Sequence, residues 1–321
     1  MRAGVIGSIA AWLGFTLPSA TVLICLGLGI TQFDIASNLG LLHGLKLVAA
    51  AVIAQAIWAM AKNYCTDLSR ICIALASAAI ILMVPNSLTQ VAVIVASGLI
   101  GALIFNTKTT DKQTFIHIPV RRKTGFILLI LLTLLLLTLP LIAQKTQSYP
   151  INLFANLFQT GSLVFGGGHV VLPLLQSQVV PTAWVDNDTF LAGYGLTQAM
   201  PGPLFTFAAY IGAVSSQAPS GWTGGLIALV AIFSPSFLMV IGIMPFWDQL
   251  RKNSSIQRSI LGVNSAVVGI LIAAFYSPVW ISTVLNMKDI GFVILFYLLL
   301  QKWKLPPWLV VLLGAILGVF I

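Results

Sequence analysis

The chain has 321 residues, of which 59% are hydrophobic and only 7% are charged, and its mean hydropathy is +1.02. Soluble domains carry about 25% charged residues. This chain has too few charges to cover a water-facing surface, which excludes a soluble enzyme, a disordered chain and a nucleic-acid-binding domain. Its net charge of +9 is therefore assigned to loops beside a lipid bilayer, not to a nucleic-acid partner. The three cysteines (Cys25, Cys65 and Cys72) are too few and too scattered for a disulfide framework or a zinc site, so neither a metal nor a cofactor is expected.

Long apolar runs follow one another along the whole chain. A helix needs about 20 apolar residues to cross the hydrocarbon core of a membrane. The candidate spans, in chain order, are Ala3–Ile30, Leu41–Ala61, Ile71–Val84, Leu88–Phe105, Gly125–Ala143, Asn152–Leu175, Phe190–Val214, Gly224–Pro245, Ile260–Val284, Ile290–Leu300 and Pro306–Ile321. They predict an all-α polytopic membrane protein with about 11 spans, several of which are short or broken by Gly and Pro.

The basic residues indicate how these spans are oriented. Residues 106–123 form the most basic loop, and further Lys and Arg residues cluster between Trp247 and Ser259. The positive-inside rule then places these loops and the N-terminus in the cytoplasm and the C-terminus outside. The same alternation places Asp186 and Asp188 in a cytoplasmic turn, where we expect them to be solvated, with Asp188 or Thr189 capping the next helix.

An internal repeat is visible in the spacing of Gly, Pro and Asp. Gly4 to Ser19 matches Gly221 to Ser236 residue by residue in spacing, and two further pairs of motifs keep an offset near 218 residues. The matched spans run in opposite directions, so we expect two inverted-topology repeats. The predicted units are an incomplete first transporter repeat (1–105), a basic cytoplasmic loop (106–123), an extra joining transmembrane helix (124–145) and a complete second repeat (146–321). Residues 152–217 have no counterpart, so the first repeat is expected to lack its N-terminal part.

The densest cluster of glycines within an apolar run is Gly166, Gly167 and Gly168, followed by His169. Each glycine costs a helix roughly 1 kcal/mol, so three together suggest a purpose. One interpretation is a broken helix whose free N–H groups face an anion. The other is close packing of helices through small residues. His169 is either a core histidine with a hydrogen-bond partner or a residue that lines the same site.

A second break contains Gln198, Pro201, Gly202, Pro203 and Thr206. The two prolines interrupt a helix because each lacks an N–H group. We expect a single span interrupted near the membrane midplane, with Gln198 and Thr206 as hydrogen-bond donors. The alternative is a loop between two re-entrant pieces, which would also line a cavity.

Lys46 lies inside a candidate span, where a cation is a functional-site hypothesis, although it is also close enough to the span's external end to snorkel. Its counterpart in the repeat is Asn264. We expect both at the substrate site. The sequence contains seven acidic residues, all of them Asp, and none falls within a predicted span, which favours an anion over a cation as cargo. Neither a phosphate loop nor a nucleophile triad is found, so an enzyme is not expected.

At these motifs the chain resembles the chromate ion transporter family, long-chain type. The similarity lies in Phe165–Leu175, Leu191–Gly195, Gln198–Tyr210, Trp12–Ser19 and Gly262–Asn264. The resemblance implies a multi-pass protein of the bacterial inner membrane that exports chromate by secondary transport, through a site also shaped for sulfate-like divalent oxyanions. Long members carry a similar glycine and Pro-Gly-Pro pair in their first half, which this sequence lacks. The alternatives are a sulfate or other oxyanion importer, or an inactive truncated membrane protein that needs a missing half. The expected partners are the oxyanion and the lipid bilayer, with a second copy of the chain as a further candidate.

Overall fold

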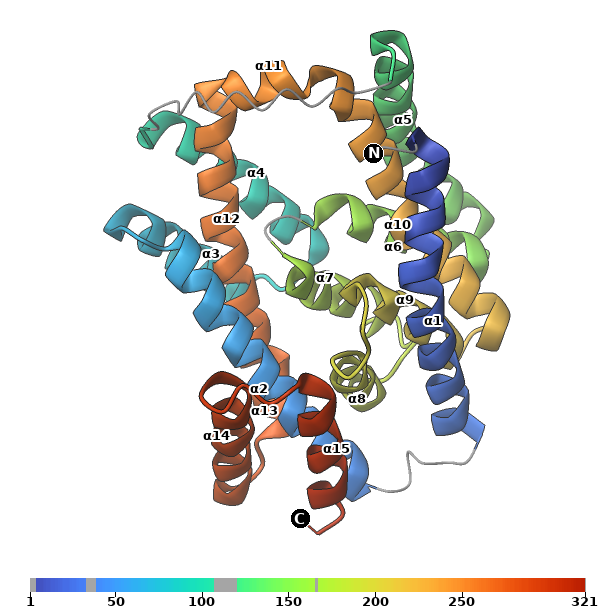
Figure 1. The fold of residues 1–321 in the computed structure, drawn as a ribbon, viewed down its shortest axis with the longest axis vertical. Coiled ribbons are helices and arrows are strands. Elements are labelled where there is room, and N and C mark those ends of the chain that lie inside the picture. The colour runs from blue at the N-terminus through green and yellow to red at the C-terminus, as the bar shows by residue number, and fades with distance from the viewer. Residues whose placement is uncertain (1–3, 33–38, 107–119, 165–166, 321) are drawn as a thin grey trace.

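The computed structural model describes residues 4–32, 39–106, 120–164 and 167–320, and all regular secondary structure in these residues is helical (Figure 1). The helices are α1 (Gly4–Gln32), α2 (Leu39–Tyr64), α3 (Leu68–Met83), α4 (Ser87–Ile104), α5 (Arg122–Thr146), α6 (Tyr149–Leu163), η2 (Gly168–Val170), α7 (Val171–Val179), α8 (Asn187–Thr197), η3 (Leu204–Thr206), α9 (Phe207–Val214), α10 (Gly221–Ile243), η4 (Met244–Phe246), α11 (Trp247–Lys252), α12 (Ser254–Ala274), η5 (Phe275–Trp280), α13 (Ile281–Thr283), α14 (Met287–Gln301) and α15 (Pro307–Gly318). Five helical stretches in the described residues are long and apolar enough to cross a membrane. The chain is therefore an all-α polytopic membrane protein, as predicted.

The two long helices α2 and α12 each carry a helical hairpin. α3 and α4 pack along α12, whereas α14 and α15 pack along α2 (Figure 1). Small residues bring the axes together, because a Cβ atom on Gly44 would collide with the carbonyl of Gly314 and one on Gly101 would lie 2.9 Å from Gly262. In the predicted repeat, α2 corresponds to α12 and the pair α3–α4 to α14–α15. Each long helix thus carries the hairpin of the other predicted repeat, which supports the inverted repeat, while its unit boundaries stay a prediction.

The segment from α6 to α9 doubles back twice. The start of α6 lies beside the end of α9, since the Tyr149 hydroxyl donates to Ser215 Oγ. The Tyr149 ring also meets Trp184, in the turn between α7 and α8, at 5.1 Å. The Ser216 N–H donates to the Trp184 carbonyl over 2.9 Å, so α9 ends where α8 begins. α6–α7 and α8–α9 are therefore two antiparallel hairpins that open at the same end.

This arrangement corrects the prediction of a single interrupted span over 190–214, and it also shows that 152–175 reverses direction. The alternative of a loop between two re-entrant pieces is the one that the structure has. Each half-helix is short, with eleven residues in α8 and eight in α9. A Gly and Pro break permits a reversal as readily as a kink, and hydrophobicity alone does not distinguish the two.

The hairpin α8–α9 lies at the centre of the apolar core. Phe190, Tyr194, Phe207 and Tyr210 are all fully buried there, and Phe207 makes ring contacts with the other three. α1 covers one side of α9, and α2 crosses α8. Helices that are apolar on all faces belong in the interior of a large protein. The packing of α8 and α9 in this interior holds the breaks next to them in fixed positions.

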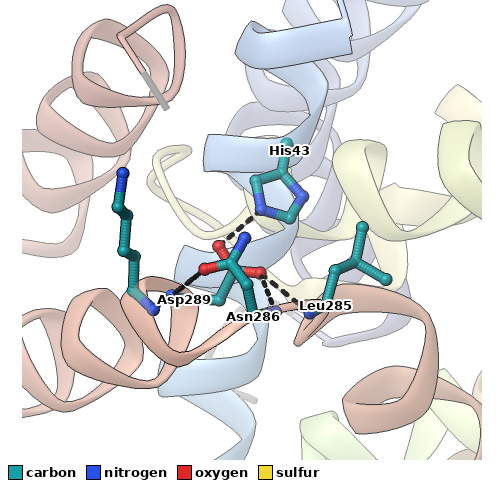
Figure 2. Close-up of polar contacts among 5 residues, drawn as sticks. His43, Leu285, Asn286 and Asp289 are labelled. Carbon is teal, nitrogen blue, oxygen red and sulfur yellow. Dashed lines mark hydrogen bonds and ion pairs between the residues drawn. The ribbon is translucent and has the colours of Figure 1, made fainter.

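A buried carboxylate joins α14 to α2. Asp289 is 0% exposed, and its Oδ1 lies 2.8 Å from His43 Nε2 (Figure 2). Its Oδ2 accepts hydrogen bonds from the backbone N–H groups of Leu285 and Asn286 at 2.8 and 3.1 Å. Asp289 lies one residue outside the predicted span Ile290–Leu300. A capping box and the cover of α2 bury it at the start of α14.

Candidate functional site

The two predicted breaks meet at the tips of the two hairpins. The first tip, between α6 and α7, contains Gly167, Gly168 and His169, whereas Gly166 lies outside the described residues. The second tip, between α8 and α9, contains residues 198–206. A Cβ atom on Gly168 would lie 3.2 Å from the Leu204 side chain, so the tips are in contact. Residues that the sequence separates by more than thirty positions thus form one surface.

His169 is joined to the second hairpin by a hydrogen bond. Its Nδ1 lies 2.8 Å from the hydroxyl of Tyr194 on α8. Tyr194 is completely buried, whereas His169 is only partly buried at the tip. Gln198 is the residue that caps the C-terminal end of α8. The Gln198 Nε2 is buried without a hydrogen-bond partner in the described part of the chain, and a buried donor of that kind has an unmet need for an acceptor.

The Pro-Gly-Pro tip rests on α1. The Ser19 hydroxyl donates to the carbonyl of Pro201. Gly202 has φ +145°, and a Cβ atom there would lie 2.8 Å from Ser19 Oγ and 3.3 Å from the Phe15 carbonyl. This is a position where only glycine combines the backbone angle with the close approach. The turn itself therefore requires glycine at this position, and the contact with α1 fixes where the tip lies.

Pro203 and Thr206 stabilise the start of the helix that leaves this tip. The Thr206 hydroxyl and its N–H both donate to the carbonyl of Pro203, at 2.8 and 3.0 Å. Thr206 is 1% exposed. Its hydroxyl proton is used within the loop, so the residue shapes the tip and has no free proton to donate.

The Lys46 side chain points along α8 towards its start, away from the two tips, although the neighbouring Leu45 carbonyl lies against Gly195. Its Nζ lies 2.9 Å from Asp188 Oδ1, and the Lys46 side chain is 8% exposed while that of Asp188 is 53% exposed. The sequence analysis placed Lys46 near the external end of its span and Asp188 in a cytoplasmic turn. The ion pair shows that these two placements are incompatible, because α7 and α8 double back. The residue that caps α8 is Asp186, whose carboxylate accepts from the Thr189 N–H at 2.9 Å.

Asn264, the predicted counterpart of Lys46, lies half-buried on α12, the helix that packs against η2 at the first tip. The structure thus brings the first break, the second break and α12 together, and it leaves Lys46 with a counter-ion of its own. Two further residues at the tips, Tyr194 and Ser19, were missed. Both fall within motifs of the family resemblance, Leu191–Gly195 and Trp12–Ser19, but neither was named as a site residue.

The backbone at the tips is suited to a negative charge. η2 leads into α7 and η3 into α9 there, and the N–H groups of Val170, Val171, Thr206 and Phe207 already donate to carbonyls of these turns. The N–H groups that lack a partner within the helix are therefore those at the start of each 3₁₀ turn. Their partial positive charge favours an anion. The carbonyls at the end of α8 are already occupied, since Gly195, Leu196 and Thr197 accept from the next three N–H groups. The described residues contain no cluster of His, Cys and Asp that could hold a metal ion.

Comparison with known proteins gives consistent results. A profile of the chromate transporter family matches residues 1–102 and 151–319. An uncharacterized transporter of Methanocaldococcus jannaschii is 25% identical over 322 residues, which cover 99% of this chain and 77% of that protein. A probable chromate transport protein of Synechococcus elongatus is 27% identical over 324 residues, covering 98% of this chain and 77% of that protein. The chromate transport protein of Pseudomonas aeruginosa is 29% identical over 128 residues, covering 39% and 29% of the two chains. None of the solved structures matches this chain.

Proposed function

This chain belongs to the chromate transporter family, and we propose that it is a secondary transporter that exports chromate across the bacterial inner membrane. The substrate site is the junction of the two hairpin tips, with Gly167–His169 on one side and Gln198–Thr206 on the other, and Gly166 stays a predicted member of the site from the sequence. The same site accepts sulfate-like divalent oxyanions, because a tetrahedral dianion presents the same oxygens to N–H donors. In this proposal the N-terminus is cytoplasmic and the C-terminus periplasmic.

The observation that carries the proposal is the contact between the tips. It sets the N-terminal ends of α7 and α9 side by side, next to the unpartnered Gln198 Nε2 and the half-buried His169. Acidic residues are absent from both tips, so a dianion meets no like charge there. Half-helix N-termini that point at an anionic substrate are a recurring feature of secondary transporters.

Lys46 and Asn264 remain predicted members of the site. The Lys46 charge is compensated by Asp188, so Lys46 attracts an oxyanion only when that carboxylate moves away. We propose that this exchange accompanies substrate passage along α8. Asn264 approaches the site through the contact of α12 with η2.

Uptake of chromate into everted inner-membrane vesicles tests the export function, since uptake there corresponds to exit from the cell. We expect uptake by the wild-type protein, competition by sulfate, and a loss of at least tenfold in Gly167→Leu and Pro201→Ala. Gly291→Ala is the control, because no atom lies within 4 Å of a Cβ at that position.

The direction of transport is tested separately in right-side-out vesicles. Uptake into right-side-out vesicles but not into everted vesicles would show an importer. If neither preparation takes up chromate, transport by this chain is contradicted. Normal uptake by Gly167→Leu, Pro201→Ala and Lys46→Ala would refute the assignment of the site.

A further inference from the structure

We propose that a cavity beside the hairpins binds a monovalent cation, Na⁺ in the first instance. The cavity has a volume of about 370 Å³ and lies where the tip of the α3–α4 hairpin meets the end of α7 and the irregular turn η5. It runs along one face of α7 and the turn after it, from Pro173 to Pro181, whereas the oxyanion tips lie at the N-terminal end of that helix. Cation binding itself stands on the observations below, and only its role in transport rests on the proposed function.

Gln90 supplies the side chain that marks the cavity as a site. It lines the cavity from α4, it is 5% exposed, and its Oε1 has no hydrogen-bond partner in the described part of the chain. Buried acceptors are nearly always paired in folded proteins. The Gln90 oxygen therefore requires a cation or a hydrogen-bond donor that enters the cavity.

The ends of three helices supply negative potential to the same cavity. α3 ends at Met83 and α7 at Val179, and the regular part of α12 ends at Ala274, where η5 begins (Figure 1). Lining residues come from each of these ends. The C-terminal end of a helix carries a partial negative charge from its macrodipole, although at the end of α7 the carbonyls of Gln176, Val179 and Val180 already accept from N–H groups of the following turn. These ends therefore favour a cation.

Of two prolines at the cavity, one adds to this effect. Pro85 and Pro278 both line the cavity, and neither has an N–H group to donate. The Ile81 carbonyl, four residues before Pro85, consequently lacks its α-helical donor, and Ile81 also lines the cavity. Pro278 lies in a turn of π-helix, in which carbonyls accept from N–H groups five residues later, so it interrupts α12 without freeing the Ala274 carbonyl. Carbonyls at interrupted helices are the ligands that secondary transporters use for Na⁺.

The opposing contribution comes from α4, whose positive N-terminal end is also nearby. That end is closed by its own cap, because the Asn86 side chain accepts from the Thr89 N–H at 2.7 Å and from the Thr89 hydroxyl at 2.8 Å. The potential of the helix C-termini is therefore the larger influence on the cavity.

The charge of the cation follows from the chemistry of the lining. All the residues that line the cavity are neutral, and they offer amide, hydroxyl and carbonyl oxygens. Ca²⁺ and Mg²⁺ sites rely on carboxylates to balance two charges, and here none is present. A single positive charge is balanced by the helix ends and neutral oxygens, so the site fits a monovalent ion.

α7 connects this cavity to the oxyanion site. Its nine residues begin beside His169 at the first tip, and Gln176 near its other end lines the cavity. A cation at the C-terminal end and an anion at the N-terminal end both act favourably on the dipole of the same short helix. We therefore expect the cation and the oxyanion to bind cooperatively at the two ends of α7.

Thermal unfolding of the purified protein tests cation binding without any oxyanion present. At constant ionic strength, we expect NaCl to raise the unfolding midpoint in a saturable way relative to choline chloride. Gln90→Leu is expected to raise the Na⁺ dissociation constant at least tenfold, and Gln90→Glu to lower it, because a carboxylate adds a full negative charge. Gln55→Leu is the matched control, since Gln55 pairs with Gln301 on α2 and α14, away from the cavity.

The outcomes separate this inference from the proposed function. A midpoint that is the same in NaCl and choline chloride would overturn the site, and so would a Na⁺ effect that survives Gln90→Leu. If Gln90→Leu fails to fold, the wild-type protein and Gln90→Glu decide the question. A Na⁺ effect that is lost in Gln90→Leu supports the site even if chromate is not transported, whereas chromate uptake without any Na⁺ effect on stability supports the transport function alone.

Discussion

The substitution Gly202→Ala is the sharpest test of how the Pro-Gly-Pro tip is held. A residue with a side chain at φ +145° costs on the order of 1–3 kcal/mol in backbone strain. The new Cβ atom would also lie 2.8 Å from Ser19 Oγ, closer than real Cβ contacts allow. Displacing Ser19 breaks its hydrogen bond to Pro201, which contributes roughly 1 kcal/mol more.

The two costs together, about 2–4 kcal/mol, disfavour the native geometry of the tip. Because about 1.4 kcal/mol corresponds to a tenfold change in an equilibrium, we expect chromate uptake by Gly202→Ala to fall at least tenfold, with a lower unfolding midpoint. The assay is initial uptake into everted vesicles, normalised to the amount of protein in the membrane.

Two further variants make the reasoning refutable. Gly14→Ala lies on the same helix α1 with no atom within 4 Å of its Cβ position, so it should be neutral or slightly stabilising. Adding Ser19→Ala to Gly202→Ala removes one contact but leaves the backbone strain, so uptake should recover only in part. Wild-type uptake and stability in Gly202→Ala would show that the tip does not pack on α1 as described.

Three other substitutions probe the neighbouring contacts. Tyr194→Phe removes the hydrogen bond to His169, and we expect about a fivefold loss of uptake, corresponding to roughly 1 kcal/mol, with little change in stability. A double-mutant cycle on Lys46 and Asp188 should give a coupling free energy of about 1 kcal/mol or less, because the Asp188 side chain is 53% exposed; several kcal/mol would contradict the half-exposed pair. Gly44→Ala should lower the unfolding midpoint by separating α2 from α15, and an unchanged midpoint, like that of the exposed-glycine control on α1, would contradict the close packing.

Much of the fold is determined by hydrophobic composition and by the positions of Gly and Pro. A chain with 7% charged residues has to place its surface in lipid, and lipid requires helices, so the all-α class followed from the sequence. The breaks at Gly167 and Pro201 were also predictable, because Gly and Pro oppose helix formation wherever they cluster. Both kinds of signal are local, since each depends only on residues near in sequence.

The directions of the short helices depended on contacts between distant segments. The sequence of residues 190–214 is compatible with either a kinked span or a hairpin. The hairpin is decided by the packing of Tyr210 against Gly193, where a Cβ atom would collide with the ring, and by the hydrogen bond from the Tyr210 hydroxyl to the Thr189 carbonyl. The same reversal brought Asp188 to Lys46, a pairing that the alternation of spans had excluded.

The acidic residues also show which properties the sequence determines and which the tertiary structure determines. The sequence establishes that all seven acidic residues are Asp, and that none lies within a predicted span. Whether such a residue is solvated depends on what covers it, and only the tertiary structure places α2 over Asp289 and His43 against its carboxylate. The sequence thus determined that lipid surrounds the chain, that the chain is helical and where its helices break, because these properties follow from local chemistry. The tertiary structure decided which breaks meet and which charges pair, because these depend on long-range packing.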